Sequence, residues 1–219
     1  VLCGSFALAA SGEDRSEVKV AKSSIVLPTY APGGYDKTPL FYTGRVYQGA
    51  QGRVYPYPMQ DVLFDGKVDE TYTYLTLENK WLQMGLLPEH GGHLLNFTDR
   101  ETGFEAFYRQ HVVKPALIGM LGAWISGGVE WNFPHHHRAT TAMPIDWRLA
   151  ANADGSKTVW IGETELRRRL KWTIGLSMMP DRAVLRADNV FMNRGPFIES
   201  MIYWANVSVH CGDDYQIIF

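Results

Sequence analysis

Residues Glu165 to Met178 decide the fold class, and they read Glu-Leu-Arg-Arg-Arg-Leu-Lys-Trp-Thr-Ile-Gly-Leu-Ser-Met. The apolar side chains occupy even-numbered positions, namely Leu166, Leu170, Trp172, Ile174, Leu176 and Met178. A period of two places neighbouring side chains on opposite faces of a strand. This stretch is therefore predicted to be a half-buried strand with a basic outer face. Arg168 is the charged exception on the apolar side, and we expect it either to be ion-paired at the sheet rim or to point into a ligand cleft.

The same alternation continues along most of the chain. It begins near Val18, and turn residues interrupt it about every ten positions. The segment Glu70–Glu78 is β-branched and aromatic throughout, and Asn152–Gly155 is typical of a turn. No repeat or linker divides the strands. We therefore expect an all-β fold, one large antiparallel β-sandwich over residues 11–219.

Composition excludes several other classes of protein. The chain has 219 residues, 46% of them hydrophobic, and a formal net charge of −2, which is typical of one ordinary globular domain. Basic residues gather only at Glu165–Lys171, which argues against nucleic acid as the main partner. No apolar run approaches the roughly 20 residues that span a bilayer. Two cysteines, Cys3 and Cys211, cannot form a disulfide framework or a structural zinc knuckle.

The two ends of the chain indicate a longer, exported protein. Residues 1–10 are small and apolar, and Ala7-Leu-Ala9 resembles the cleavage site of a signal peptide. They are interpreted as a signal-peptide remnant, which predicts a secreted or periplasmic protein, lipid-anchored if cleavage precedes Cys3. The alternative is an apolar first strand or a ragged end. The last residues, Val209–Phe219, stop within an expected strand, so we expect the sandwich to be incomplete at its C-terminus.

The segment Gly122–Thr141 carries the most informative side chains. As a strand, it would place Trp124, Ser126, Glu130 and Asn132 on one face. An aromatic ring beside a carboxylate and an amide suits a sugar, because the ring stacks on the C–H face while the polar groups bind hydroxyls. The alternative is structural: Glu130 would satisfy buried backbone groups at a bulge formed by Gly127 and Gly128.

Three consecutive histidines follow in this segment, His135, His136 and His137. Neighbours on an extended chain point to opposite faces, so only one or two of them can serve one site. Histidine suits proton transfer near neutral pH. Metal binding by His135 and His137 with Glu130 or Asp146 is a competing interpretation, as are plain surface histidines, and we predict neither a metal nor a cofactor.

Two further segments present polar faces. The predicted strand from Phe197 to His210 would place Trp204, Asn206, Ser208 and His210 on one side, although an oligomer interface could use the same residues. The segment Leu87–Gly103 contains His90 and His93, which would flank the cleft or lie at its rim. Because two predicted strands present such polar faces, we expect them to line a cleft together.

These motifs resemble a known family. Pro88-Glu-His-Gly-Gly-His-Leu94 followed by Asp99-Arg-Glu-Thr-Gly103 resembles the first hairpin of galactose mutarotase-like (aldose epimerase) domains. The block Lys114–Arg138, which ends in Gly-Gly-Val-Glu-Trp-Asn-Phe-Pro-His-His-His-Arg, is similar to the bacterial domain of unknown function 5107 of that superfamily, as are Trp204-Ala-Asn206 and Asp213–Gln216. The resemblance runs from about Ile25 to the end of the chain. Such domains often precede tetratricopeptide repeats, so it implies such a region downstream.

The resemblance implies an antiparallel supersandwich with a sugar-binding concave face. Mutarotases open the sugar ring with histidines and a carboxylate base. By position, His136 or His137 resembles their first histidine and His210 the second, and Arg138 would hold the substrate. The usual histidine motifs are absent, and no C-terminal base precedes Phe219, so either Glu130 replaces that base or part of the site is missing.

The leading hypothesis is a carbohydrate-active domain that binds a glycan and acts on its glycosidic bond or anomeric centre. The expected catalytic residues are Glu130, His136, His137 and His210, and the expected binding residues are Trp124, Asn132, Arg138, Trp204, Asn206 and His93. Hydrolysis would need a second carboxylate beside Glu130, for which Asp146 and Glu89 are the candidates. The alternative is a non-catalytic carbohydrate-binding or structural module of a larger secreted protein.

Overall fold

The computed structural model describes residues 17–34, 55–58, 62–117, 123–135 and 137–218. The expected signal-peptide remnant, residues 1–10 with Cys3, lies outside these residues, and so does His136. The described part of the chain contains strands and a single 3-10 turn, η1 (Pro88–His90), and no α-helix. None of its segments forms a helix long and apolar enough to cross a membrane.

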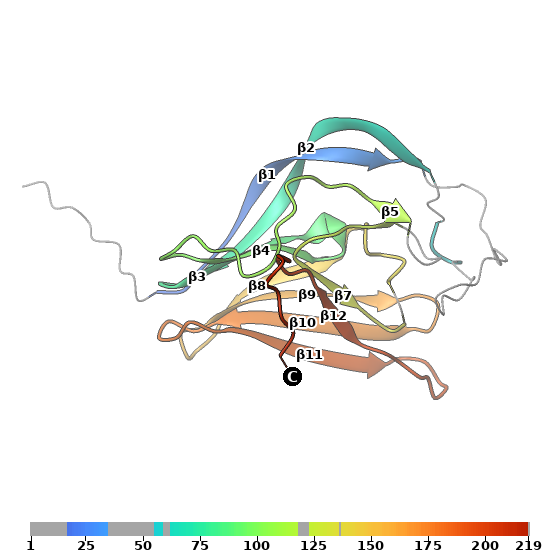
Figure 1. Ribbon diagram of the computed structural model, residues 1–219. Coiled ribbons are helices and arrows are strands. Elements are labelled where there is room, and N and C mark those ends of the chain that lie inside the picture. The colour runs from blue at the N-terminus through green and yellow to red at the C-terminus, as the bar shows by residue number, and fades with distance from the viewer. Residues whose placement is uncertain (1–16, 35–54, 59–61, 118–122, 136, 219) are drawn as a thin grey trace, which may run out of the picture.

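Two antiparallel sheets form the body of the protein (Figure 1). In spatial order, the six-stranded sheet contains β1 (Lys19–Pro32), β2 (Leu63–Glu78), β3 (Leu82–Leu87), β4 (His93–Asp99), β7 (Val129–Asn132) and β12 (Trp204–Val207). The four-stranded sheet contains β11 (Leu185–Asn193), β10 (Leu170–Met178), β9 (Lys157–Glu165) and β8 (Asp146–Ala151). A short pair, β5 (Ala116–Leu117) with β6 (Ala123–Trp124), lies outside both sheets. The predicted all-β sandwich is confirmed.

The main core lies between the two sheets. Alternate side chains of strands in both sheets form this core. They include Leu75 and Leu77 from β2, Trp131 from β7, and Trp172 and Ile174 from β10. All five side chains are buried. The burial of such apolar surface is the main driving force of folding. The six-stranded sheet is therefore apolar on its inner face.

A smaller apolar cluster covers part of the other face of the six-stranded sheet. It contains Leu27, Leu87, Leu95, Val113 and Ile125. We call this face, which points away from the four-stranded sheet, the site face.

The strand predicted from Leu166 to Met178 begins four residues late. Leu166–Arg169 form the turn from β9 to β10, where Arg169 has a φ of 58° and Leu166 is 56% exposed. The carboxylate of Glu165 stabilises this turn because it accepts a hydrogen bond of 2.8 Å from the backbone N–H of Arg168. The side chain of Arg168 forms an ion pair of 2.6 Å with Glu199, which agrees with the expected pairing at the rim.

Candidate functional site

Strands β7 and β12 place the predicted polar residues side by side. In their antiparallel register Glu130 lies opposite Asn206, and Asn132 lies opposite Trp204. Trp131 points into the core between the sheets, so its neighbours Glu130 and Asn132 point to the site face. Four of the expected site residues are thus neighbours on one surface.

A backbone bend brings Trp124 to the same place. The predicted continuous strand is interrupted at Gly127 and Gly128, whose φ angles of 91° and 52° favour glycine. A Cβ atom on Gly128 would overlap the carbonyl oxygen of Leu94, so the chain passes β4 in close contact. Because of this bend, β6 leaves the sheet, and the indole N–H of Trp124 donates a 2.9 Å hydrogen bond to Glu130 Oε2.

The carboxylate of Glu130 is the centre of the site. It is 3% exposed and accepts hydrogen bonds from His137 at 2.9 and 3.0 Å and from the Thr141 hydroxyl at 3.0 Å, as well as from Trp124. The amide of Asn206 lies 3.5 Å from Oε2. Burial raises the pKa of Glu130, but the hydrogen bond and the charge of His137 outweigh burial and hold the pKa below its usual value. Glu130 is therefore ionised at neutral pH.

The ring of His137 is held in one orientation. Its Nδ1 bonds to Glu130, and its ring meets Trp124 at a centroid distance of 5.9 Å and Trp204 at 5.1 Å, both close to edge-on. A carboxylate can only accept, so Nδ1 carries the proton and Nε2 is left with its lone pair when the ring is neutral. Nε2 makes no hydrogen bond to another described residue. With 19% of its side chain exposed, His137 can meet a ligand.

A group of buried polar side chains lies beside this centre. The amide of the fully buried Asn132 lies close enough to Glu130 to help lower the pKa of that carboxylate, but neither its oxygen nor its nitrogen makes a well-formed hydrogen bond to a described residue. The same is true of Nδ1 of His93 and of both ring nitrogens of His90. Burial lowers the pKa of both histidines to about 4, although the charge of Glu130 opposes the effect at His93. Both rings are therefore neutral at pH 7 and retain unused hydrogen-bonding capacity.

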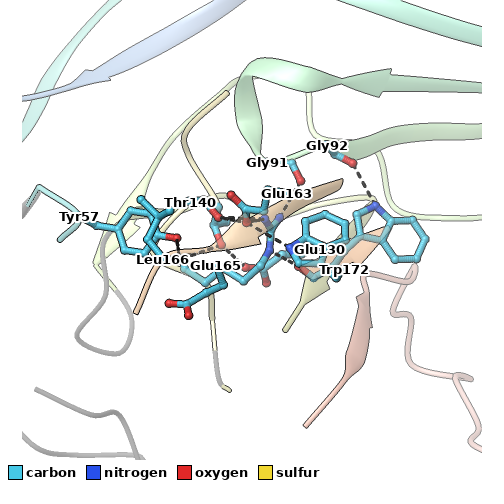
Figure 2. A network of polar contacts seen from close by, with 12 residues as sticks. Tyr57, Gly91, Gly92, Glu130, Thr140, Glu163, Glu165, Leu166 and Trp172 are labelled. Atoms are coloured by element: carbon cyan, nitrogen blue, oxygen red, sulfur yellow. Dashed lines mark hydrogen bonds and ion pairs between the residues drawn. The ribbon is translucent and has the colours of Figure 1, made fainter. Parts of the chain in front are cut away.

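The structure does not bring Arg138 to this surface. Its guanidinium lies between the sheets, 3% exposed, and packs over the ring of Trp172 at 4.5 Å from the centroid. It donates to Glu163 Oε1 at 2.7 Å and to the carbonyl of Gly91 at 2.6 Å, in the network of Figure 2. Each of the three guanidinium nitrogens donates to an acceptor of the protein itself, so Arg138 acts in the structure as a link between the sheets.

His210 also lies apart from Glu130. The strand expected from Phe197 to His210 is observed only over Trp204–Val207, so alternation no longer applies at His210. The exposed ring of His210 bonds to the carbonyl of Glu105 at 2.8 Å and lies near Phe104 and Tyr108. Its contacts place it beside the 104–108 segment rather than beside the carboxylate.

The two candidate partner carboxylates, Asp146 and Glu89, lie on other elements than Glu130. Asp146 is exposed on β8, in the other sheet. Glu89 uses Oε1 to accept a hydrogen bond of 3.1 Å from the backbone N–H of Thr73. Among the described residues, no group of three or more His, Cys, Asp or Glu side chains is arranged to hold a metal ion.

Sequence reasoning missed Thr141 and Glu163. Thr141 lies in a turn, where periodicity carries no signal, and its hydroxyl lies 3.0 Å from both Glu130 Oε1 and the Arg138 carbonyl. Glu163 lies on β9, two positions after the core residue Ile161, so the alternation of this strand does predict that Glu163 points inward. A carboxylate on this face, with only 14% of its side chain exposed, indicates a cationic partner, which is Arg138.

Comparisons with known proteins agree with this architecture. A crystal structure of a TPR-domain containing protein from Parabacteroides distasonis matches with a TM-score of 0.77 and 23% sequence identity, over 90% of this chain. The match covers 33% of that protein, so the chain spans about a third of its length. The family model described as "Domain of unknown function (DUF5107)" matches residues 50–219. The chain therefore belongs to the DUF5107 family.

Proposed function

We propose that the protein binds a carbohydrate on the site face, and that His137, oriented by Glu130, transfers a proton at the anomeric centre of the sugar. One observation carries the proposal: the 2.9 Å contact between His137 and Glu130, with the imidazole held between two tryptophan rings. Indole rings beside polar groups are suited to the alternating C–H and O–H surface of a sugar.

The chemistry follows from the protonation states. In the neutral form of His137, ionised Glu130 fixes the proton on Nδ1, so Nε2 can accept a proton from a hydroxyl of the ligand. Removal of the proton of the anomeric hydroxyl and return of a proton to the ring oxygen breaks the ring C–O bond, and the reverse step closes it on either face. Half-buried Trp204 is the proposed stacking surface, with Asn206 and Asn132 as hydroxyl partners.

Hydrolysis of a glycosidic bond is less well supported. It ordinarily uses two carboxylates on either side of the bond. Asp146 lies on the other sheet, and one oxygen of Glu89 is engaged by the backbone of β2.

The second candidate is a module that binds sugar without reacting. It is favoured by the burial of Glu130, whose two oxygens are engaged by Trp124, His137 and Thr141. Such a carboxylate can serve to hold the site rigid.

As part of the same proposal, we include a mutarotase-like relationship, an extracytoplasmic location and a neighbouring tetratricopeptide-repeat region. The sandwich fold supports the first of these, and the similarity to a TPR-domain containing protein supports the last.

The deciding experiment is NMR of the protein with a panel of neutral reducing sugars. Binding is read from ligand line broadening, and anomer exchange from saturation transfer between the two anomeric protons. We expect His137→Ala to abolish exchange while binding falls by less than about tenfold, and Trp204→Ala to weaken binding by about tenfold or more. His111→Ala, which removes an exposed histidine elsewhere, is the matched control.

The outcomes separate the candidates. Exchange that is unaffected by His137→Ala, or by Glu130→Gln, contradicts the catalytic proposal. Binding with no exchange in the wild-type protein supports the non-catalytic module. Absence of both broadening and exchange across the panel overturns carbohydrate binding on this face.

A further inference from the structure

The four-stranded sheet carries two neighbouring hollows on its outer face, on the opposite side of the sandwich from Glu130. Because Ile161, Trp172 and Ile174 point into the core, the neighbouring positions along β9 and β10 point outward. The first hollow has a volume of about 370 Å³, and its lining includes Trp160 and Arg148. These two residues are directly paired on β9 and β8.

The indole of Trp160 reaches across this hollow toward β10. Its cross-strand partner on β10 is Gly175, and a Cβ atom on Gly175 would lie 2.6 to 2.9 Å from three atoms of the six-membered indole ring. The ring therefore lies over the neighbouring strand, in space that only glycine leaves open. Trp160 also borders a second hollow of about 300 Å³, which includes Thr158 and Ser177, so the indole stands between two hollows that follow β9 and β10.

The first hollow is lined by cations that have no carboxylate partner. Arg148, Lys171 and Arg194 are exposed, and none forms an ion pair within the described part of the chain. Glu163, which also borders the hollow, is bound to Arg138. Asp146 is the remaining carboxylate there, so positive charge is in excess although the whole chain is formally −2.

The second hollow differs in its charge balance. Its arginines are paired, Arg182 with Asp181 at 3.1 Å and Arg186 with Asp188 at 2.8 Å. An elongated ligand on this sheet would therefore meet a cationic end and a neutral, hydroxyl-rich end, with the indole between them.

We propose that the outer face of the four-stranded sheet is a second binding site, for an acidic polysaccharide chain. Sugar rings stack on Trp160, and carboxylates of the chain pair with Arg148, Lys171 and Arg194. The two hollows give the chain length to lie along the strands, and Gly175 leaves open the space that the indole ring occupies. This site is independent of the function proposed for the site face, because the two lie on different sheets and share no residue.

Calorimetric titration of the protein with hexagalacturonate and with maltohexaose, a neutral chain of equal length, tests the proposal. We expect the acidic chain to bind more tightly, and its affinity to fall as sodium chloride rises from about 0.02 to about 0.5 M, because salt screens exposed charges. The triple variant Arg148→Gln, Lys171→Gln, Arg194→Gln should weaken binding of the acidic chain by at least about tenfold. Trp160→Ala should weaken both chains.

A matched variant controls for net charge. The variant Lys67→Gln, Lys80→Gln, Lys114→Gln removes the same number of positive charges from exposed positions outside both hollows and should leave the affinity unchanged. The variant with Arg148, Lys171 and Arg194 replaced alters only exposed side chains, so it tests the proposed acidic-chain site even if Trp160→Ala fails to fold.

Three results would overturn the proposal. They are no binding of the acidic chain, an equal loss in the two triple variants, and a loss caused by Trp204→Ala but not by the Arg148, Lys171 and Arg194 substitutions. The last result would assign the acidic chain to the site face. Loss of anomer exchange in His137→Ala with unchanged binding of hexagalacturonate would leave both proposals standing.

Discussion

The guanidinium of Arg138 shows how one side chain can join two sheets. It receives support from β7 through the carbonyl of Trp131, from the η1 turn through Gly91, and from β9 through Glu163. Five donors in a planar fork can bind several acceptors at fixed angles, which an ammonium group cannot do. The role of Arg138 is thus to hold the site-bearing sheet against its partner.

Replacement of Arg138 by lysine should therefore be costly. Arg138→Lys keeps the charge but loses the forked contacts and the stacking on Trp172, leaving buried acceptors unsatisfied. We expect the free energy of unfolding in urea to fall by about 3 kcal/mol or more. Arg186→Lys, at a side chain that is 73% exposed, should change it by less than about 0.5 kcal/mol. Equal effects of the two substitutions would contradict the structural role.

Single residues were predictable where they lie within a regular strand. Alternation correctly grouped Glu130 with Asn132 and Trp204 with Asn206, because each pair spans two positions of one strand. It could not place Arg138, since this residue follows β7 in irregular backbone and its direction depends on long-range acceptors. Whether these residues bind a ligand stays a prediction.

At the scale of elements, strand interiors were predictable and strand ends were not. The alternating pattern of Leu170–Met178 is real, but Leu166 fits it by chance, because Leu166–Arg169 form a turn. β12 ends at Val207, although the apolar and polar positions still alternate up to His210. Such ends are set by contacts with distant segments, such as the hydrogen bond from Tyr108 N–H to the Ser208 carbonyl, which local sequence does not record.

The bend at Gly128 can be tested against another glycine of similar conformation. Gly128 has a φ of 52° and touches Leu94, whereas Gly103 has a φ of 74° and open space around it. Gly103→Ala should cost about 1 kcal/mol, the usual penalty for a left-handed conformation. Gly128→Ala adds a backbone clash and should abolish cooperative unfolding or cost at least about 3 kcal/mol more. Urea unfolding followed by circular dichroism would measure both, and similar losses would show that β4 is not in tight contact.

At the scale of the whole molecule, the segment from Phe197 onward leaves apolar side chains in solvent. Phe197 is 74% exposed and Ile198 is fully exposed. Contiguous apolar surface of this kind promotes association or dye binding. The double variant Phe197→Ser, Ile198→Ser should lower fluorescence of a hydrophobic dye and any self-association in sedimentation, with the free energy of unfolding changed by less than about 0.5 kcal/mol. Unchanged dye binding would place the exposed surface elsewhere.

The two buried histidines make the stability of the whole domain depend on pH. The pKa of His90 and of His93 is about 4 in the folded protein, against about 6.5 in an unfolded chain. Between these values the unfolded chain binds more protons, so protonation favours unfolding. Stability is complete above about pH 6.5 and falls as the pH drops toward 4, by about 2 kcal/mol for each histidine at pH 5.

Urea unfolding at pH 7 and pH 5 measures this dependence. The variant His90→Gln should lose about half of the difference between the two pH values, because its side chain no longer binds a proton in the unfolded state. His111→Gln, which alters an exposed histidine, should keep the whole difference. A wild-type protein equally stable at pH 7 and pH 5 would mean that the two rings gain protons without unfolding, which requires acceptors or water around their unpartnered nitrogens. In that case the polar group beside Glu130 would be open to solvent, and therefore to a ligand, at both pH values.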